Sequence, residues 1–149
     1  MGYKFKNRYL ICRIAFKDGR PIAESAGESS NLVLQKAIRQ QLHVLFGDVG
    51  LGSALVSCQV KYVDSTHGIC VVRCGRDEYR RVWLALSCIR DIEMRVCRIT
   101  VIGCTGSVES CKTMVVEKTV NERRQQCGNQ NDDELFMDQV REQVNLLEQ

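Results

Sequence analysis

The spacing of apolar residues along this chain changes repeatedly between two periods, and this change restricts the fold more than any other feature of the sequence. In residues 9–16, apolar side chains alternate with positions that include Arg13, which predicts a half-buried strand. A loop rich in Gly, Ser and charge follows and contains the only proline, Pro21. Apolar residues then recur at helical spacing until Gly47, and a Ser or Asn at 29–31 can cap this helix. The strand's apolar face consists of Leu10, Cys12, Ile14 and Phe16, and that of the helix consists of Leu34, Ala37, Ile38, Leu42 and Leu45.

The middle of the chain continues this succession of strand and helix patterns. Residues 53–62 alternate cleanly, and a turn at 64–68 separates them from a further strand pattern at 68–74, so the pair predicts a hairpin. Residues 76–93 have one apolar helical face, and residues 97–104 predict another strand. The expected buried face of 53–62 is Ala54, Val56, Cys58, Val60 and Tyr62, and that of the 76–93 helix is Tyr79, Val82, Trp83, Leu86 and Ile89.

The C-terminal part of the chain predicts a third helix over residues 107–126 and a polar linker over 127–133. A last segment carries a narrow apolar stripe, which is too short to be a secure helix in isolation. The stripe consists of Leu135 or Phe136, Val140, Val144 and Leu147.

The order strand, helix, strand, strand, helix, strand predicts an α/β (α+β) fold of the ferredoxin-like, split βαβ type. In this sandwich two helices pack on one face of a four-stranded antiparallel sheet, with the third helix and the C-terminal amphipathic segment added. We expect the other face to be open, with residues 1–124 forming the domain and residues 125–149 a solvated acidic linker and tail. The open face is expected to present some of Arg13, Gln59, Lys61, Arg73, Arg98 and Thr100.

Length and cysteine usage restrict the class of protein. The chain has 149 residues and 44% hydrophobic content, which suits one core rather than two domains. Neither a membrane span nor a secretory signal is expected, because no long apolar run is present and the N-terminus is charged. The nine cysteines are odd in number and several lie in apolar strand patterns, so we expect reduced core thiols in a cytosolic or nuclear protein.

Charge is distributed unevenly along the chain. Residues 1–124 carry 20 Lys and Arg against 12 Asp and Glu, which gives +8, and residues 125–149 carry 1 against 6, which gives −5 and accounts for the total of +3. A basic body with an acidic tail favours a polyanionic partner over an acidic substrate or a membrane.

The familiar catalytic and ligand-binding motifs are missing from the sequence. The glycines of FGDVGLGS follow a helix and match no dinucleotide fingerprint, and no P-loop is present. The only histidines, His43 and His67, accompany no recognisable nucleophile or carboxylate pair, and the cysteines lack metal-ligand spacing. No catalytic residue and no metal ligand is therefore predicted. Tyr62 is the single aromatic of the central strands, so the sheet lacks the stacking platform of an RNA-recognition motif.

Two groups of basic residues remain as candidates for nucleic-acid binding. Near the N-terminus, cations alternate with other residues and can follow a phosphate backbone from one edge of an extended chain. The second group surrounds the start of the 76–93 helix, where backbone N–H groups add donors. An ordinary solvated surface is the alternative at this point. The first group is Lys4, Lys6 and Arg8, with Asn7 between them, and the second is Arg73, Arg76, Arg80 and Arg81.

A long ordered series of residues resembles the archaeal and eukaryotic Pop-five subunits of ribonuclease P. The resemblance spans about residues 3–115 and includes the segments FKNRYL and FGDVGLGSALVSCQVKYVDSTHGICVVRCGRDEYRRVWLAL. One position departs from it, because Glu109 stands where members of this family usually carry Arg.

The resemblance implies a non-catalytic, RNA-binding subunit of ribonuclease P, and of ribonuclease MRP, in the nucleus and nucleolus. Such a subunit assists the catalytic RNA in removing the 5′ leader of precursor tRNA, beside a TIM-barrel-like partner of the Rpp-thirty type and other protein subunits. No cofactor is expected on the protein, since Mg²⁺ is held by RNA and substrate. Two other classes stay open: a ligand-sensing ferredoxin-like regulatory domain, and an enzyme of acylphosphatase type, although the loop after residue 16 lacks the compact anion cradle of the latter.

Overall fold

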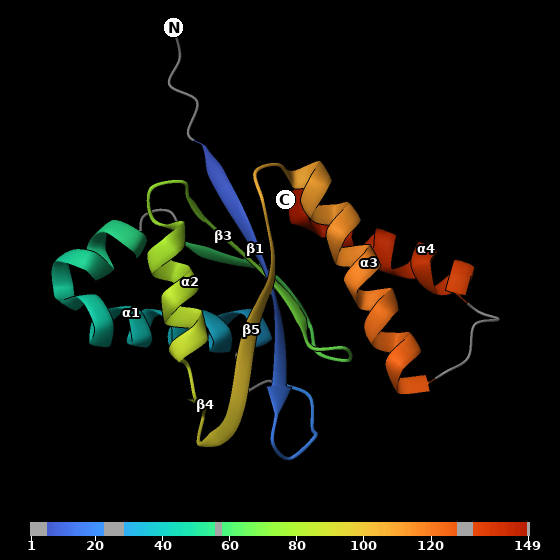
Figure 1. Cartoon of the computed structure of the whole chain (residues 1–149), viewed down its shortest axis with the longest axis horizontal. Helices are drawn as coiled ribbons and strands as arrows, with labels where there is room; N and C mark the ends of the chain where they lie inside the picture. Colours follow the sequence, from blue (N-terminus) through green and yellow to red (C-terminus); the bar gives the residue numbers. More distant parts are fainter. Residues whose placement is uncertain (1–5, 23–28, 56–57, 128–132, 149) are drawn as a thin grey trace, which may run out of the picture.

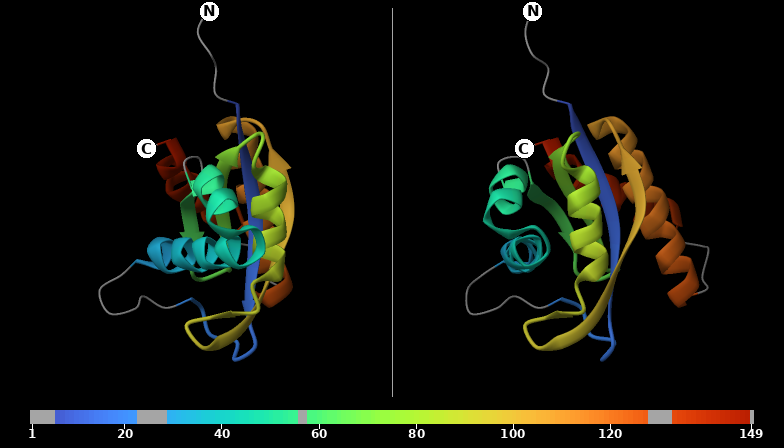
Figure 2. Two further views of the ribbon diagram at one scale, coloured as in Figure 1. Left: turned by 90° about the vertical axis from the view of Figure 1, so that its left-hand side faces the viewer. Right: turned by 60° about the vertical axis from the view of Figure 1, so that its left-hand side comes forward.

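The computed structural model describes residues 6–22, 29–55, 58–127 and 133–148. Two pairs of helices enclose one antiparallel sheet in three layers, with α1 and α2 on one side and α3 and α4 on the other (Figures 1 and 2). No helix in these ranges is long and apolar enough to cross a membrane. The elements are β1 (Asn7–Phe16), α1 (Ser30–Leu55), β2 (Gln59–Asp64), β3 (Ile69–Gly75), α2 (Tyr79–Cys88), β4 (Asp91–Ile92), β5 (Arg95–Thr105), α3 (Val108–Cys127), α4 (Asp133–Val144) and η1 (Asn145–Glu148).

The sheet confirms the predicted ferredoxin-like class. Its strand order is β2-β3-β1-β5-β4, so β3 lies between β2 and β1 as a split βαβ unit requires. The sheet has five strands rather than four. The extra strand, β4, comes from the end of the predicted 76–93 helix, which stops at Cys88. Glu93 and Met94 both have positive φ, and they make the turn that returns the chain from β4 into β5.

Helices α1 and α2 cover the first core of the protein. Apolar residues of β1, β3 and β5 point toward these helices and are buried together with Leu34, Ile38 and Leu42 of α1. On α2 the buried positions are Val82, Ala85 and Leu86, and the predicted burial of Trp83 is wrong, because this side chain is 39% exposed. The centre of the buried face of α2 therefore lies between Val82 and Ala85, and Trp83 lies outside this face.

The opposite face of the sheet is largely covered, so the expected solvated tail is wrong. The expected open face is confirmed only in part, since Gln59 and Arg98 are exposed there. Buried residues of α3, α4 and η1 form a second core with the strands. Arg13, expected on an open face, pairs with Glu122 of α3 at 2.8 Å. The predicted domain end at residue 124 falls within α3, and the acidic segment beyond it supplies part of this core. The second core contains Tyr9, Ile11, Tyr62, Ile69, Val71, Cys111, Val115, Val116, Val120, Val140, Val144 and Leu147.

The segment between α1 and β2 differs most from its prediction. Gly47 has φ 71° and ψ −169°, which interrupts the helix, but helical structure resumes and continues to Leu55. The predicted strand over 53–62 therefore begins only at Gln59. A register shift between Val60 and Tyr62 makes Lys61 an extra residue, so Tyr62 lies in the second core and not on the same face as Val60.

Candidate nucleic-acid interface

The two predicted basic groups meet at one end of the sheet. β1 begins where β3 ends, and their antiparallel pairing places Asn7 opposite Gly75 and Arg8 opposite Cys74. The backbone N–H of Arg76 donates a hydrogen bond of 2.9 Å to the carbonyl oxygen of Lys6. Residues 70 positions apart in the sequence are therefore neighbours, and we call this region the basic end of the sheet.

Two helices begin at the basic end, as Figure 1 shows for α2 and α3. α2 starts at Tyr79, four residues after β3 ends, and α3 starts at Val108, three residues after β5 ends. The first turn of a helix carries unsatisfied N–H groups and the positive end of the helix dipole. Ser107 caps α3, since its Oγ accepts a hydrogen bond of 3.2 Å from the N–H of Ser110. The helix termini and the cations thus favour negative charge at the same place, and Glu109 already supplies one carboxylate in the first turn of α3.

The N-terminal group lies beside the turn that leads into α3. Lys6 is exposed, and Asn7 and Arg8 are half-buried. The Arg8 guanidinium donates 3.2 Å to the Asn7 carbonyl oxygen. It also lies so close to Gly106 that a Cβ added there would be 3.1 Å from Nη1. Lys4, the first predicted contact, lies outside the described residues. A hollow of about 410 Å³ is bounded by residues 6–9 and 106–108.

The basic residues around the start of α2 differ in how far their side chains contact the rest of the protein. Arg81 pairs with Glu78 at 3.2 Å and lies 5.8 Å from the Phe46 ring centroid. Arg80 is exposed, and a hydrogen bond of 3.3 Å to the Tyr79 hydroxyl raises the pKa of its guanidinium. Arg76 is exposed as well. Arg76 and Arg80 are therefore better placed than Arg81 to contact an external anion.

Arg73 is separated from Arg80 and Arg81 by the sheet itself. It lies opposite Tyr9 of β1 and opposite Gln59 of β2, and Tyr9 belongs to the second core. Arg73 therefore faces the α3 and α4 side, whereas α2 carries Arg80 and Arg81 over the first core. All eight predicted RNA contacts stay predictions, because geometry alone does not test binding.

The turn at Gly106 and Ser107 belongs to this region but is absent from the sequence-based set of residues. Its position follows from the pairing of β5 with β1, in which Thr105 lies opposite Tyr9. Ser107 could have been identified from the sequence, because a Ser that precedes a helical pattern commonly caps the N-terminus of that helix.

The thiols near the basic end are not activated nucleophiles. Burial raises the pKa of Cys74 to about 12 and also raises that of Cys104, while the nearby Arg8 lowers both by a smaller amount. A thiol held in its neutral form is a weak nucleophile. Among the described residues, no group of three or more His, Cys, Asp or Glu side chains could hold a metal ion. The region is equipped to bind negative charge rather than to form covalent intermediates.

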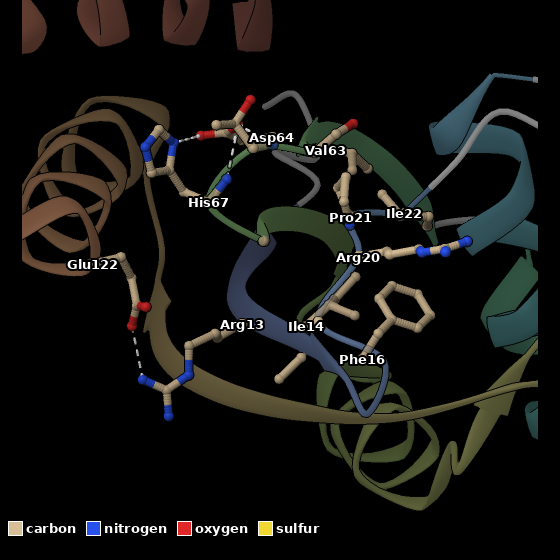
Figure 3. Close-up of a pocket in the computed structure, with 15 residues that line it drawn as sticks. Arg13, Ile14, Phe16, Arg20, Pro21, Ile22, Val63, Asp64, His67 and Glu122 are labelled. Atoms are coloured by element: carbon tan, nitrogen blue, oxygen red, sulfur yellow. Dashed lines mark hydrogen bonds and ion pairs between the residues drawn. The ribbon is translucent and has the colours of Figure 1, made fainter. Parts of the chain in front are cut away.

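A second hollow lies at the opposite end of β1 (Figure 3) and has a volume of about 230 Å³. Most of its charged side chains pair with each other: His67 Nδ1 lies 2.9 Å from Asp64 Oδ2, and Arg13 pairs with Glu122. Ile14, Phe16 and Pro21 add apolar surface. Because its charges are already balanced, this hollow favours a polyanion less than the basic end does.

Comparisons with known proteins agree on one group of relatives. The Rpp14/Pop5 family model matches residues 8–116. A protein of Arabidopsis thaliana described as "Probable ribonuclease P/MRP protein subunit POP5" is 34% identical over 151 residues, covering 97% of each chain. The "Ribonuclease P/MRP protein subunit POP5" of Schizosaccharomyces pombe is 27% identical, over 80% of this chain and 89% of its own. The human protein of that name is 25% identical, over 76% and 70%.

A solved structure shares the fold. One chain of a structure described as "Cryo-EM structure of yeast Ribonuclease MRP" superposes with a TM-score of 0.54, covering 86% of this chain and 98% of that one. The two sequences are 13% identical. The architecture is thus common to both chains although few residues are.

Proposed function

The chain belongs to the Rpp14/Pop5 family, and from this premise we propose that it is a protein subunit of ribonuclease P and ribonuclease MRP. The observation that carries the proposal is the match to a ribonuclease P/MRP subunit over 97% of both chains. A match of this extent includes the strands that form the basic end and the C-terminal helices that form the second core. The family assignment thus applies to the whole fold rather than to one motif.

The basic end of the sheet is the surface that we propose for RNA binding. Lys6, Arg76 and Arg80 are exposed there, beside the N-termini of α2 and α3. Lys and Arg side chains that neutralise phosphates release condensed counterions, which is the main source of affinity for an RNA backbone. In this proposal the protein holds catalytic RNA or precursor tRNA in place and takes no part in bond cleavage.

The remaining parts of the proposal concern the assembly. The catalytic RNA removes the 5′ leader of precursor tRNA, and Mg²⁺ is held by RNA and substrate. The protein partner is a TIM-barrel-like subunit of the Rpp-thirty type, and the complex resides in the nucleus and nucleolus. The similarity of the chain to ribonuclease P/MRP subunits supports these points.

Sequencing of the RNA that copurifies with the tagged full-length chain tests the subunit role. We expect enrichment of the ribonuclease P RNA and the ribonuclease MRP RNA over an unrelated tagged protein of similar charge. Recovery of the protein without either RNA would contradict the proposal and favour the ligand-sensing alternative.

A cleavage assay tests the non-catalytic role. Protein stripped of RNA should leave precursor tRNA intact in the presence of Mg²⁺, since its described residues include no cluster of metal ligands. Cleavage that persists after nuclease treatment and repurification would show that the protein itself is the catalyst.

A further inference from the structure

The only tryptophan of the chain, Trp83, lies on the surface of α2. It is 39% exposed and stands outside the buried face that Val82, Ala85 and Leu86 form. A large apolar ring in contact with water gains free energy when another flat or apolar surface covers it. Trp83 therefore offers a binding surface that the first core leaves partly uncovered.

Two aromatic residues and a cation share one side of α2. Tyr79 and Arg80 precede Trp83 by four and three residues, so the three side chains lie on the same side of the helix. Arg80 Cζ lies 5.8 Å from the centroid of the Tyr79 ring, and Arg80 Nε donates 3.3 Å to the Tyr79 hydroxyl. Arg80 is exposed, whereas Tyr79 is half-buried against the first core. We call Tyr79, Arg80 and Trp83 the aromatic side of α2.

The aromatic side of α2 is directed away from α1. α2 lies between α1 and β5 and contacts both (Figure 1). The side of α2 that faces α1 is marked by Arg81, which lies 5.8 Å from the centroid of the Phe46 ring. Trp83 is two residues further along, which places it about 200° around the helix from Arg81. The indole is therefore on the side of α2 opposite to this contact with α1.

Positive charge accompanies the aromatic side of α2. Arg76 is exposed in the turn before the helix, and the N–H groups of the first turn add partial positive charge. Residues 76–83 contain three Arg against two acidic residues, and one of these, Glu78, pairs with Arg81. An exposed aromatic ring beside cations matches a nucleotide, which has a flat base and a negative phosphate. An apolar protein surface would match the ring but not the cations.

We propose that Trp83 stacks on an unpaired base of the bound RNA, while Arg76 and Arg80 contact phosphates of the same strand. The inference rests on the proposed RNA-binding function and names its substrate class, which is single-stranded RNA. Bases inside a duplex are stacked on their neighbours, so they offer no free face to an indole. This platform differs from that of an RNA-recognition motif, because it lies on a helix rather than on the sheet.

Fluorescence of the full-length chain tests the stacking directly, because Trp83 is the only source of tryptophan emission. The probes are a short dye-labelled oligouridylate, whose anisotropy reports binding, and a blunt RNA duplex of the same length. Stacking on a base quenches indole emission. Bound oligouridylate should therefore quench the emission strongly, and the duplex should leave it nearly unchanged. Equal quenching by the duplex, or no quenching by bound oligouridylate, would overturn the inference.

Substitutions at Trp83 provide a second test. Trp83→Leu keeps an apolar side chain but removes the stacking face, and it should weaken oligouridylate binding roughly 5- to 150-fold. The slope of log K against log salt should not change, since no charge is lost. Trp83→Phe should restore part of the affinity.

The neighbouring positions supply matched controls. Leu84 is 48% exposed on the same helix, and Leu84→Ala should bind oligouridylate like the parent. Arg80→Gln should instead lower the salt slope by about 0.7, the value for one phosphate contact on a single strand. Thermal unfolding of each variant shows whether the fold is intact. The quenching experiment uses the parent chain, so it is decisive even if a variant fails to fold.

The outcomes separate this inference from the proposed function. If the parent binds in vitro transcribed ribonuclease P RNA and Trp83→Leu binds it equally well, the RNA-binding function stands and the stacking inference fails. If the parent does not bind this RNA, both proposals fail. If Trp83→Leu reduces binding of a protein subunit but not of RNA, Trp83 is a protein contact and the inference is overturned.

Discussion

Gly68 lies in the turn between β2 and β3, at a position that only glycine suits. Its φ is +73°, and a Cβ added there would lie 2.5 Å from the carbonyl oxygen of Ile14. Its own carbonyl oxygen accepts a hydrogen bond of 2.7 Å from the Ile14 N–H. Gly68→Ala should therefore lower the free energy of unfolding by more than the roughly 1 to 2 kcal/mol that positive φ alone costs an L-residue. Urea unfolding of the variant measures this loss.

Gly19 is the matched control for this substitution. It also has φ +73°, but a Cβ there would meet no atom within 4 Å. Gly19→Ala should show the conformational cost without the steric one. Equal losses in the two variants would mean that the close approach to β1 does not matter for stability.

Because several thiols are buried, the free energy of unfolding should change with pH in the alkaline range. Burial raises the pKa of Cys58 to about 12, well above the roughly 8.5 of an unfolded thiol. Between these values the unfolded chain loses a proton that the folded chain keeps. The contribution of this thiol to stability is therefore fully present below about pH 8 and declines as the pH rises through this window. The stability difference between the parent and Cys58→Ala should shrink between pH 7 and pH 10, as measured by urea unfolding. A constant difference would show that the thiol is accessible to solvent.

For single residues, the sequence predicts that a segment is a strand more reliably than it predicts which face of the sheet each side chain occupies. Alternation places Tyr62 with Val60, but the bulge at Lys61 adds one residue and moves Tyr62 to the other core. Helical spacing likewise includes Trp83 in the buried stripe, whereas Ala85 lies closer to its centre. The first error arises from an irregularity of the backbone, and the second from which helix positions the neighbouring elements cover.

Among the elements, α4 depends most on tertiary contacts. Its apolar stripe is too narrow for a stable isolated helix, yet Val144 is 1% exposed in the second core. Val144→Ala should lower the free energy of unfolding by roughly 2 kcal/mol through lost burial and the cavity that remains. Val44→Ala on α1, where the side chain is 69% exposed, should change it by less than about 0.5 kcal/mol. Chemical denaturation of the two variants compares them directly, and an unaffected Val144→Ala variant would indicate a solvated C-terminal segment.

The elements that the sequence predicts best are those with long, unambiguous periodicity. β1, β3, β5 and α3 lie within about two residues of their predicted bounds. The error over residues 53–55 arises because a short apolar alternation is compatible with either helix or strand. Gly47 has the backbone angles of a helix break, but the helix resumes after it and continues to Leu55, and spacing alone does not reveal this.

On the scale of the whole molecule, the pairing of the strands determines which residues form the basic end of the sheet. The two basic groups were predicted from separate stretches of sequence, and the antiparallel pairing of β1 with β3 unites Lys6 and Arg76. The separation of Arg73 from Arg80 and Arg81 could not be predicted, since it depends on which face of the sheet each strand position occupies. Because the second face is largely covered, the proposed RNA contacts lie at the end of the sheet.

The exposed cations of the basic end should act together in binding RNA. Lys6, Arg76 and Arg80 are exposed, and replacing all three with Gln should reduce the slope of log K against log salt for ribonuclease P RNA by about 2 to 3. The melting temperature should be retained, because exposed substitutions of this kind change stability little. A triple variant that removes Lys17, Arg39 and Arg90 provides the control, since it has the same net charge but lacks changes at the basic end. If both triple variants flatten the salt dependence equally, binding responds to net charge alone and the basic end is not a site. A larger loss in the first variant localises the phosphate contacts to the end where β1 begins and both α2 and α3 start.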